Sequence, residues 1–232
     1  MSDEKIATYE DLAGLMEHSL LRPELTETEV AQGCDLAKEY GIAAVLVRPS
    51  DVDLAINWMK GSAVALGTIV DWPHGSSSTS VKTYAVRDML RRGAKEIDTV
   101  MNTGKLASRQ FQYLEMELVQ MADACHQAAA VLKVTLQSEF LDRELKILAC
   151  RIAKRAGIDY LASSPLEDFA LLAEYLRGRA RFKAAGPVES LDDALRFRDA
   201  GCTRIASEHT AAILDAWKTR LAEESATTPV IS

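Results

Sequence analysis

Residues Gly93–Met101 read GAKEIDTVM and contain an arrangement that recurs along the chain. A glycine can end a helix because it adopts the left-handed conformation easily, and the short run after it is apolar apart from two carboxylates. Side chains alternate across a strand, so Glu96 and Asp98 share one face. An ionisable group inside an apolar strand costs free energy unless it is paired. The segment therefore predicts a buried strand with a paired acidic face.

Similar segments lie on both sides of this one. Gly41, Gly157 and Gly201 also follow amphipathic helices and precede short apolar runs. Runs rich in Val, Ile, Leu and Ala are typical of strands that are buried on both faces of a parallel sheet. The sequence predicts eight such strands, at Met16–Leu21, Ala43–Val47, Ala63–Ile69, Glu96–Met101, Val131–Leu136, Ile158–Ala162, Arg181–Ala185 and Thr203–Ala206.

The helices predicted between these strands carry start signals. Thr26 and Glu29 form a capping box, in which each side chain accepts a backbone hydrogen bond from the other residue. Ser108 can cap the helix that contains Phe111, and Ser190 can cap a later one. These signals divide the chain into alternating strands and helices.

The alternation favours a single (β/α)8 TIM barrel, a parallel eight-stranded α/β fold over residues 1–232. A short lead is expected at about 1–10, and a frayed tail at about 223–232. An open doubly wound sheet is the alternative, although no glycine-rich fingerprint follows the first strand.

Composition narrows the class of protein. The net charge is −7 without a basic cluster, which argues against nucleic acid as a partner. No apolar run approaches the roughly 18 residues of a membrane span, and residues 1–10 lack the apolar region of a secretory signal. The four cysteines have no CxxC spacing, which favours reduced thiols in a cytoplasmic protein.

Polar residues inside the predicted strands are the candidates for chemistry, because TIM-barrel active sites lie at the carboxyl ends of strands. Besides Asp98, they include Lys133 and Lys183. A lysine in a low-dielectric pocket can become an amine nucleophile, and a nearby carboxylate can transfer protons. The alternative is a salt-bridge network that only fills the barrel.

The sequence resembles the deoxyribose-phosphate aldolase family from about Glu17 to Glu208. The resemblance rests on six ordered segments. They are EHSLLRP at 17–23 for DHTLLKP, VRPS at 47–50 for VNPS, WPHG at 72–75 for FPxG, AKEIDTVMNTG at 94–104 for AxEIDxVINxG, LKV at 132–134, and FKAAG at 182–186 for VKAAG.

The resemblance implies roles for three residues. Asp98 corresponds to an aspartate that takes part in proton transfer. Lys183 corresponds to the lysine that lowers the pKa of the Schiff-base lysine, and Lys133 to a lysine of the same network. It also implies a class I aldolase, which is a carbon–carbon lyase, acting on a small carbonyl or sugar-derived substrate. No cofactor is expected.

Several segments depart from the family pattern at the same end of the barrel. Residues 159–165 read DYLASSP where the family has a segment like DFIKTST, so Ala162 stands at the position of the nucleophilic lysine. Proline follows Gly186 and removes a backbone donor, and Ser207-Glu208 lies in the segment that replaces a phosphate-binding turn. Arg48 replaces an asparagine.

Two classes of function remain open on these residues. One is an enzyme with altered carbonyl chemistry, in which Lys183 is the remaining amine and Arg48, His74, Gly186, Ser207 and Glu208 contact the substrate. The other is a catalytically inactive homologue that serves as a binding, regulatory or assembly protein. The dispersed histidines give no metal site, and a homodimer is one possible assembly.

Overall fold

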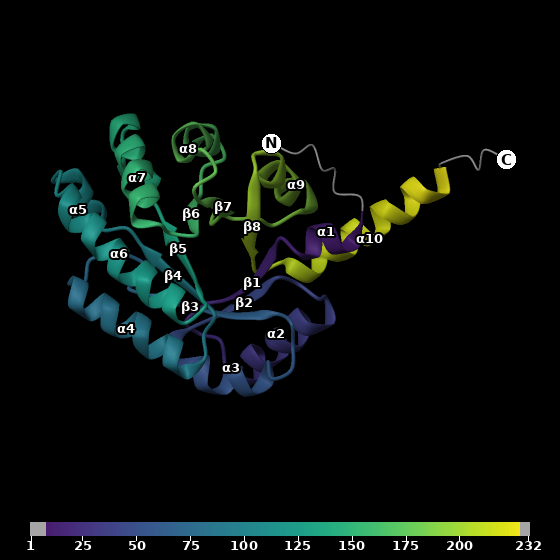
Figure 1. The fold of residues 1–232 in the computed structure, drawn as a ribbon. Helices are drawn as coiled ribbons and strands as arrows, with labels where there is room; N and C mark the ends of the chain where they lie inside the picture. The colour runs from purple at the N-terminus through teal and green to yellow at the C-terminus, as the bar shows by residue number, and fades with distance from the viewer. Residues whose placement is uncertain (1–7, 228–232) are drawn as a thin grey trace.

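The structure is a computed structural model that describes residues 8–227. Eight parallel strands hydrogen-bond in chain order, and the last pairs with the first to close a barrel. This confirms the (β/α)8 prediction and excludes the open sheet (Figure 1). The strands are β1 (Met16–Leu20), β2 (Ala44–Val47), β3 (Ala65–Val70), β4 (Glu96–Val100), β5 (Val131–Thr135), β6 (Tyr160–Ser163), β7 (Arg181–Ala184) and β8 (Cys202–Ser207).

The barrel wall separates two kinds of interior. Alternate residues of β4, such as Ile97, belong to the apolar core between the strands and the surrounding helices. The residues between them, Glu96 and Asp98, are equally buried but face the barrel axis. The apolar core therefore lies outside the barrel, while charged side chains occupy its centre.

The helices surround the barrel (Figure 1). They are α1 (Tyr9–Ala13), α2 (Glu27–Glu39), η1 (Pro49–Asp51), α3 (Val52–Trp58), α4 (Thr79–Arg92), α5 (Thr103–Ala107), α6 (Phe111–Gln127), η2 (Ser138–Phe140), α7 (Arg143–Ala156), α8 (Asp168–Leu176), α9 (Leu191–Asp199) and α10 (Thr210–Thr227).

Two of the three predicted helix caps are confirmed. Thr26 and Ser190 each form a complete capping box at the start of α2 and α9. The prediction for Ser108 is wrong, because this residue ends the short helix α5 and its N–H donates to the carbonyl of Gly104 at 3.0 Å. Arg109 then adopts a positive φ of 56°, so the chain turns before α6 begins.

The first and last helices of the described chain lie side by side. Helix α1 packs against α10 (Figure 1), and the Trp217 indole N–H donates to the carbonyl of Thr8 at 3.0 Å. Tyr9 begins α1 inside the predicted lead, and α10 continues to Thr227 inside the predicted tail. Residues 1–7 and 228–232 of those two segments lie outside the described part. No helix within residues 8–227 is long and apolar enough to cross a membrane.

Candidate active site

The centre of the barrel holds a cluster of charged side chains, three of each sign, among the described residues. All six are buried, with exposed fractions from 0% to 9%. The carboxylates come from β1 and β4, and the cations from β5, β7 and β8. The members of this central cluster are Glu17, Glu96, Asp98, Lys133, Lys183 and Arg204.

Each cation of the central cluster pairs with a carboxylate. Lys183 Nζ donates to both Glu17 and Asp98. Lys133 Nζ also donates to Glu17, and it lies 2.7 Å from Glu96 Oε2 and 3.7 Å from Asp98 Oδ1. The Arg204 guanidinium lies 2.6 Å from Glu96 Oε1. The structure thus brings together Asp98, Lys133 and Lys183, as the sequence predicts.

Glu17 joins the two lysines. Burial alone would raise the pKa of this carboxyl group, but the charges and hydrogen bonds of Lys133 and Lys183 outweigh burial and lower its pKa to about 2. Glu17 is therefore ionised across the whole neutral range. The carboxylate ties β1 to β5 and β7 across the barrel.

Asp98 responds differently to the same surroundings. Burial raises the pKa of its carboxyl group above the usual value, Lys133 and Lys183 oppose that rise, and the nearby negative charge of Glu17 adds to it. Its Oδ1 has no hydrogen-bond partner, whereas Oδ2 accepts from Lys183. A buried carboxyl with a raised pKa and one free oxygen can accept and return a proton.

Lys133 contacts all three carboxylates of the central cluster. Burial would lower the pKa of its ammonium group, but Asp98, Glu17 and Glu96 outweigh burial and raise it. Lys133 is therefore a fixed positive charge. Its side chain is fully buried, and its catalytic role stays a prediction.

Ala162 lies beside this cluster. In the strand register it pairs with Lys183 on β7 and with Thr135 on β5, so its methyl group faces the barrel interior. The residue is fully buried. A longer side chain at this position would enter the space next to Lys183.

A cavity of about 360 Å³ opens at the carboxyl ends of β1, β7 and β8. Three of its lining residues lie two positions after a member of the central cluster, on the same strand or directly at its end: Ser19 after Glu17, Ala185 after Lys183, and Ala206 after Arg204. Residues two apart face the same side of a strand, so this mouth cavity lies directly above the charges. The other lining residues are Gly186, Pro187, Val188, Glu189, Ser207, Glu208 and His209.

Several polar groups that line the mouth cavity already form hydrogen bonds or ion pairs within the protein. The Ser207 hydroxyl donates to the carbonyl of Val188 at 2.5 Å and accepts from the backbone N–H of His209 at 2.9 Å. Pro187 has no N–H to offer. The Glu208 carboxylate lies 3.5 Å from the Arg22 guanidinium. Two carboxylates, those of Glu189 and Glu208, thus border a cavity whose lining contains no lysine or arginine.

Gly186 is required by a close backbone approach. A Cβ atom there would lie 2.9 Å from the carbonyl oxygen of Ser164. The β7 end therefore packs tightly against the segment after β6. This contact fixes one wall of the mouth cavity.

The structure places two other candidates away from the mouth cavity. The Arg48 guanidinium donates to Asp51 at 2.6 Å and to the carbonyls of Arg22, Pro23 and Leu25. It therefore fastens the loop between β1 and α2. His74 is exposed in the loop between β3 and α4 and does not line the mouth cavity. Whether either residue contacts a substrate stays a prediction.

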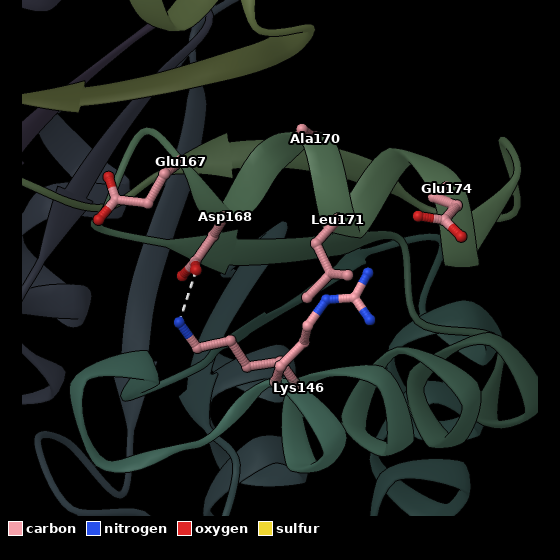
Figure 2. A pocket seen from close by; sticks show the side chains of 7 residues that line it. Lys146, Glu167, Asp168, Ala170, Leu171 and Glu174 are labelled. Carbon is pink, nitrogen blue, oxygen red and sulfur yellow. Dashed lines mark hydrogen bonds and ion pairs between the residues drawn. The ribbon is translucent and has the colours of Figure 1, made fainter.

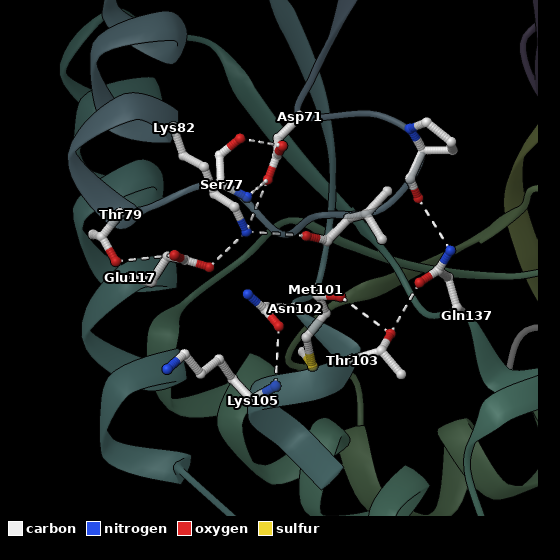
Figure 3. A network of polar contacts seen from close by, with 12 residues as sticks. Asp71, Ser77, Thr79, Lys82, Met101, Asn102, Thr103, Lys105, Glu117 and Gln137 are labelled. Carbon is white, nitrogen blue, oxygen red and sulfur yellow. Dashed lines mark hydrogen bonds and ion pairs between the residues drawn. The ribbon is translucent and has the colours of Figure 1, made fainter. Parts of the chain in front are cut away.

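A second polar network fixes that loop and its neighbours (Figure 3). The fully buried Lys82 Nζ lies 2.8 Å from Glu117 Oε1 and 3.4 Å from Asp71 Oδ2. Gln137 donates to the carbonyl of Pro73 at 3.1 Å and accepts from Thr103 at 3.0 Å. These contacts connect the loops after β3, β4 and β5.

Another cavity, of about 390 Å³, lies outside the barrel between α7 and α8. Lys146 and Asp168 meet there at 2.6 Å (Figure 2), and Asp168 also accepts from the Ser163 hydroxyl at 2.6 Å. This cavity is lined by residues of α7, of α8 and of the segment just before α8. The mouth cavity lies at the carboxyl ends of strands that carry the central cluster, so it is the one that belongs to the candidate site.

Sequence analysis missed two members of the central cluster, Glu17 and Arg204. Both are charged residues inside short apolar strands, which is the same signal that identified Asp98 and Lys183. The predicted strand Met16–Leu21 contains three consecutive polar residues, so its strand signal is weak and Glu17 does not stand out in it. The register of β8 beside β7 brings Arg204 to the level of Lys183.

Comparisons with known proteins point in one direction. No family model matches the chain. The deoxyribose-phosphate aldolase of Treponema denticola is 33% identical over 212 residues, which cover 88% of this chain and 98% of that protein. The deoxyribose-phosphate aldolase of Bacteroides thetaiotaomicron is 33% identical over 219 residues, covering 91% and 92% of the two chains.

Solved structures agree with these relatives. The aldolase QR15 has a TM-score of 0.86 and 27% identity, covering 92% of this chain and 98% of its own. The deoxyribose-phosphate aldolase of Aeropyrum pernix has a TM-score of 0.84 at 24% identity, covering 92% and 93%, and it supports the fold alone.

Proposed function

This chain belongs to the deoxyribose-phosphate aldolase family, and on that premise we propose that it performs altered carbonyl chemistry on a small aldehyde or sugar derivative. The observation that carries the proposal is the buried Asp98–Lys183 pair directly below the mouth cavity. The pair combines a positive charge with a proton acceptor next to a space that a small substrate can enter. This combination suits proton transfer beside a carbonyl group.

The chemistry is proposed to be altered because Ala162 stands where the resemblance places the Schiff-base lysine. An alanine side chain cannot form an imine. The amine nearest to it is Lys183, whose Nζ donates to two carboxylates. A paired ammonium group has no free electron pair for attack on a carbonyl, but it can stabilise negative charge on a carbonyl oxygen.

A cleavage step without an imine can be written on these two groups. Asp98 takes the proton from the hydroxyl of a β-hydroxy carbonyl compound, the carbon–carbon bond breaks, and an aldehyde leaves. The bonding electrons form an enolate, whose oxygen is stabilised by the positive charge of Lys183. Asp98 then returns the proton to the enolate carbon. The carboxyl group ends the cycle in its starting state, so no other reactant is required.

The mouth cavity favours an unphosphorylated substrate. A phosphate dianion needs cations or free N–H donors, and this cavity offers Glu189 and Glu208 with a proline at 187. The hydroxyl of Ser207 already donates to a backbone carbonyl. Neutral hydroxyl groups of a sugar fit these surroundings better than a phosphate does.

A second candidate function is a catalytically inactive homologue with a binding, regulatory or assembly role. It is favoured by the pairing of every cation in the central cluster, because a closed ion-pair network can serve only to fill the barrel. The two candidates differ in whether Asp98 and Lys183 affect any turnover.

The test is cleavage of 2-deoxyribose and of 2-deoxyribose 5-phosphate, measured as the release of acetaldehyde. We expect slow release from the unphosphorylated sugar, and a loss of about 100-fold or more in Asp98→Asn and Lys183→Met. Lys60→Met, on an exposed lysine outside the central cluster and the mouth cavity, is the matched control. Equal release from wild type and from both site variants would remove the enzyme proposal and leave the inactive homologue.

A further inference from the structure

Glu17 is the one carboxylate that contacts both lysines of the central cluster through hydrogen bonds. Its Oε2 accepts from Lys133 and its Oε1 from Lys183, and the side chain is fully buried. Neither oxygen is left for a substrate. Glu17 can therefore affect the chemistry of the site only through Lys133 and Lys183.

The balance of charge in the cluster depends on this residue. With Glu17, three carboxylates face three cations, so every cation is compensated. Without it, two carboxylates would face three cations in a buried space. A buried cation that lacks a counter-charge loses its proton more easily. Lys183 would be the affected group with the best access, because it lies below the mouth cavity.

We infer that Glu17 is a positioning residue that keeps Lys183 a paired ammonium group and so closes the imine route at this lysine. The ammonium can donate a hydrogen bond to a carbonyl oxygen, but it cannot attack the carbonyl carbon. This inference rests on the proposed function for its catalytic meaning. The reactivity of the Lys183 amine can, however, be measured without any turnover.

The experiment is reductive alkylation with acetaldehyde and cyanoborohydride, followed residue by residue with mass spectrometry. An unprotonated amine forms an imine with acetaldehyde, and the hydride of cyanoborohydride reduces that imine to a stable ethylamine. We expect Glu17→Gln to raise the rate of alkylation at Lys183 by about tenfold or more over wild type. The pH profile of that alkylation should also move toward neutral pH, which a purely structural effect would not produce.

Glu96→Gln is the matched control variant. Glu96 is also buried in the central cluster and contacts Lys133 and Arg204, but it has no contact with Lys183. The Glu96→Gln variant therefore removes a buried carboxylate without removing a counter-charge from Lys183. Two internal controls lie on the same chain: the fully buried Lys82, which reports unfolding, and the exposed Lys60, which reports the reagent.

A rise at Lys183 in Glu17→Gln, without a rise at Lys82 or in Glu96→Gln, supports the inference. An unchanged rate at Lys183 in folded Glu17→Gln overturns it, as does an equal rise in Glu96→Gln. If Glu17→Gln does not fold, alkylation of the wild type takes its place, with the exposed Lys60 as the reference. Alkylation of wild-type Lys183 as fast as that of Lys60 at neutral pH also overturns the inference. Failure of deoxyribose cleavage alone would remove the proposed function and leave the role of Glu17 standing.

Discussion

Ala162 and Glu17 together define the chemistry available at the residue scale. Ala162 presents a methyl group to the barrel interior next to Lys183, and Glu17 supplies the carboxylate that holds Lys183 and Lys133. A site with an amine at 162 would contain three lysines around the same carboxylates. The present site contains two, and both are paired.

Restoring the amine is the direct test of position 162. In Ala162→Lys, a fourth cation enters a cluster of three carboxylates, so one amine should lose its proton near neutral pH. We expect covalent trapping of acetaldehyde by borohydride at residue 162. Turnover should follow only if the substrate is held correctly, because a misplacement near 1 Å can cost about 100-fold.

Ala162→Met is the control, since it adds similar volume without an amine, and both variants should lose about 1–3 kcal/mol from overpacking. A folded Ala162→Lys protein that traps no aldehyde would show that the pocket differs from an imine-forming site by more than this residue.

The carboxyl ends of β1, β7 and β8 form the walls of the mouth cavity, and the residues there determine what the cavity can bind. We expect no measurable heat when deoxyribose 5-phosphate or inorganic phosphate is titrated by calorimetry. The reason is that Glu208 adds negative charge and Pro187 lacks a donor. Glu208→Gln should permit weak binding, since it removes that charge. Micromolar affinity in the wild type would contradict this and would point to another phosphate-binding group, such as Arg22.

The loops after β3, β4 and β5 depend on the buried Lys82–Glu117 pair (Figure 3). Lys82→Met leaves the Glu117 carboxylate buried without its cation, which should cost about 3–5 kcal/mol of unfolding free energy. The double variant Lys82→Met/Glu117→Gln should cost less than the sum of the two single variants, because the buried charges of Lys82 and Glu117 are removed together. Urea unfolding measures all three. A loss below about 1 kcal/mol in Lys82→Met would contradict the account.

The sequence predicts the strands more completely than it predicts the contacts of the site. Strand positions were predictable to within about two residues, because strands buried on both faces are continuous apolar runs. Ser108 misled the prediction because a serine can follow one helix as well as precede another, and the short α5 gave no periodic signal. At the site, the face of Asp98 followed from alternation. Its pairing with Lys183 depends on the barrel register and could not be predicted from spacing.

The stability of the whole molecule should depend on pH, and His18 is the first group to contribute as the pH falls below neutral. Burial lowers the pKa of its imidazole from 6.5 to about 4, so the folded state binds fewer protons than the unfolded state between these values. This contribution to stability is complete above pH 6.5 and is lost as the pH falls toward 4. The loss should reach roughly 2 kcal/mol at pH 5.

Glu17 has a separate window. Its lowered pKa stabilises the fold above its unfolded value of 4.5, and this contribution is lost as the pH falls toward 2. The two effects can therefore be measured apart. Between pH 7.5 and 5, the urea midpoint of His18→Gln should fall less than that of wild type, since glutamine keeps a polar contact with Thr210 without titrating. Identical slopes in the two proteins would contradict the assignment to His18.

The most direct test of the central claim is hydrogen exchange at the carbon next to a carbonyl, observed by NMR with acetaldehyde in D2O. The claim is that Asp98 moves a proton beside a carbonyl whose oxygen is stabilised by Lys183, without a covalent adduct. We expect deuterium in the methyl group with wild type, none above the buffer rate with Asp98→Asn, and in both proteins far slower borohydride trapping at Lys183 than at the exposed Lys60. Exchange that survives in Asp98→Asn, or trapping at wild-type Lys183 as fast as at Lys60, would contradict the claim.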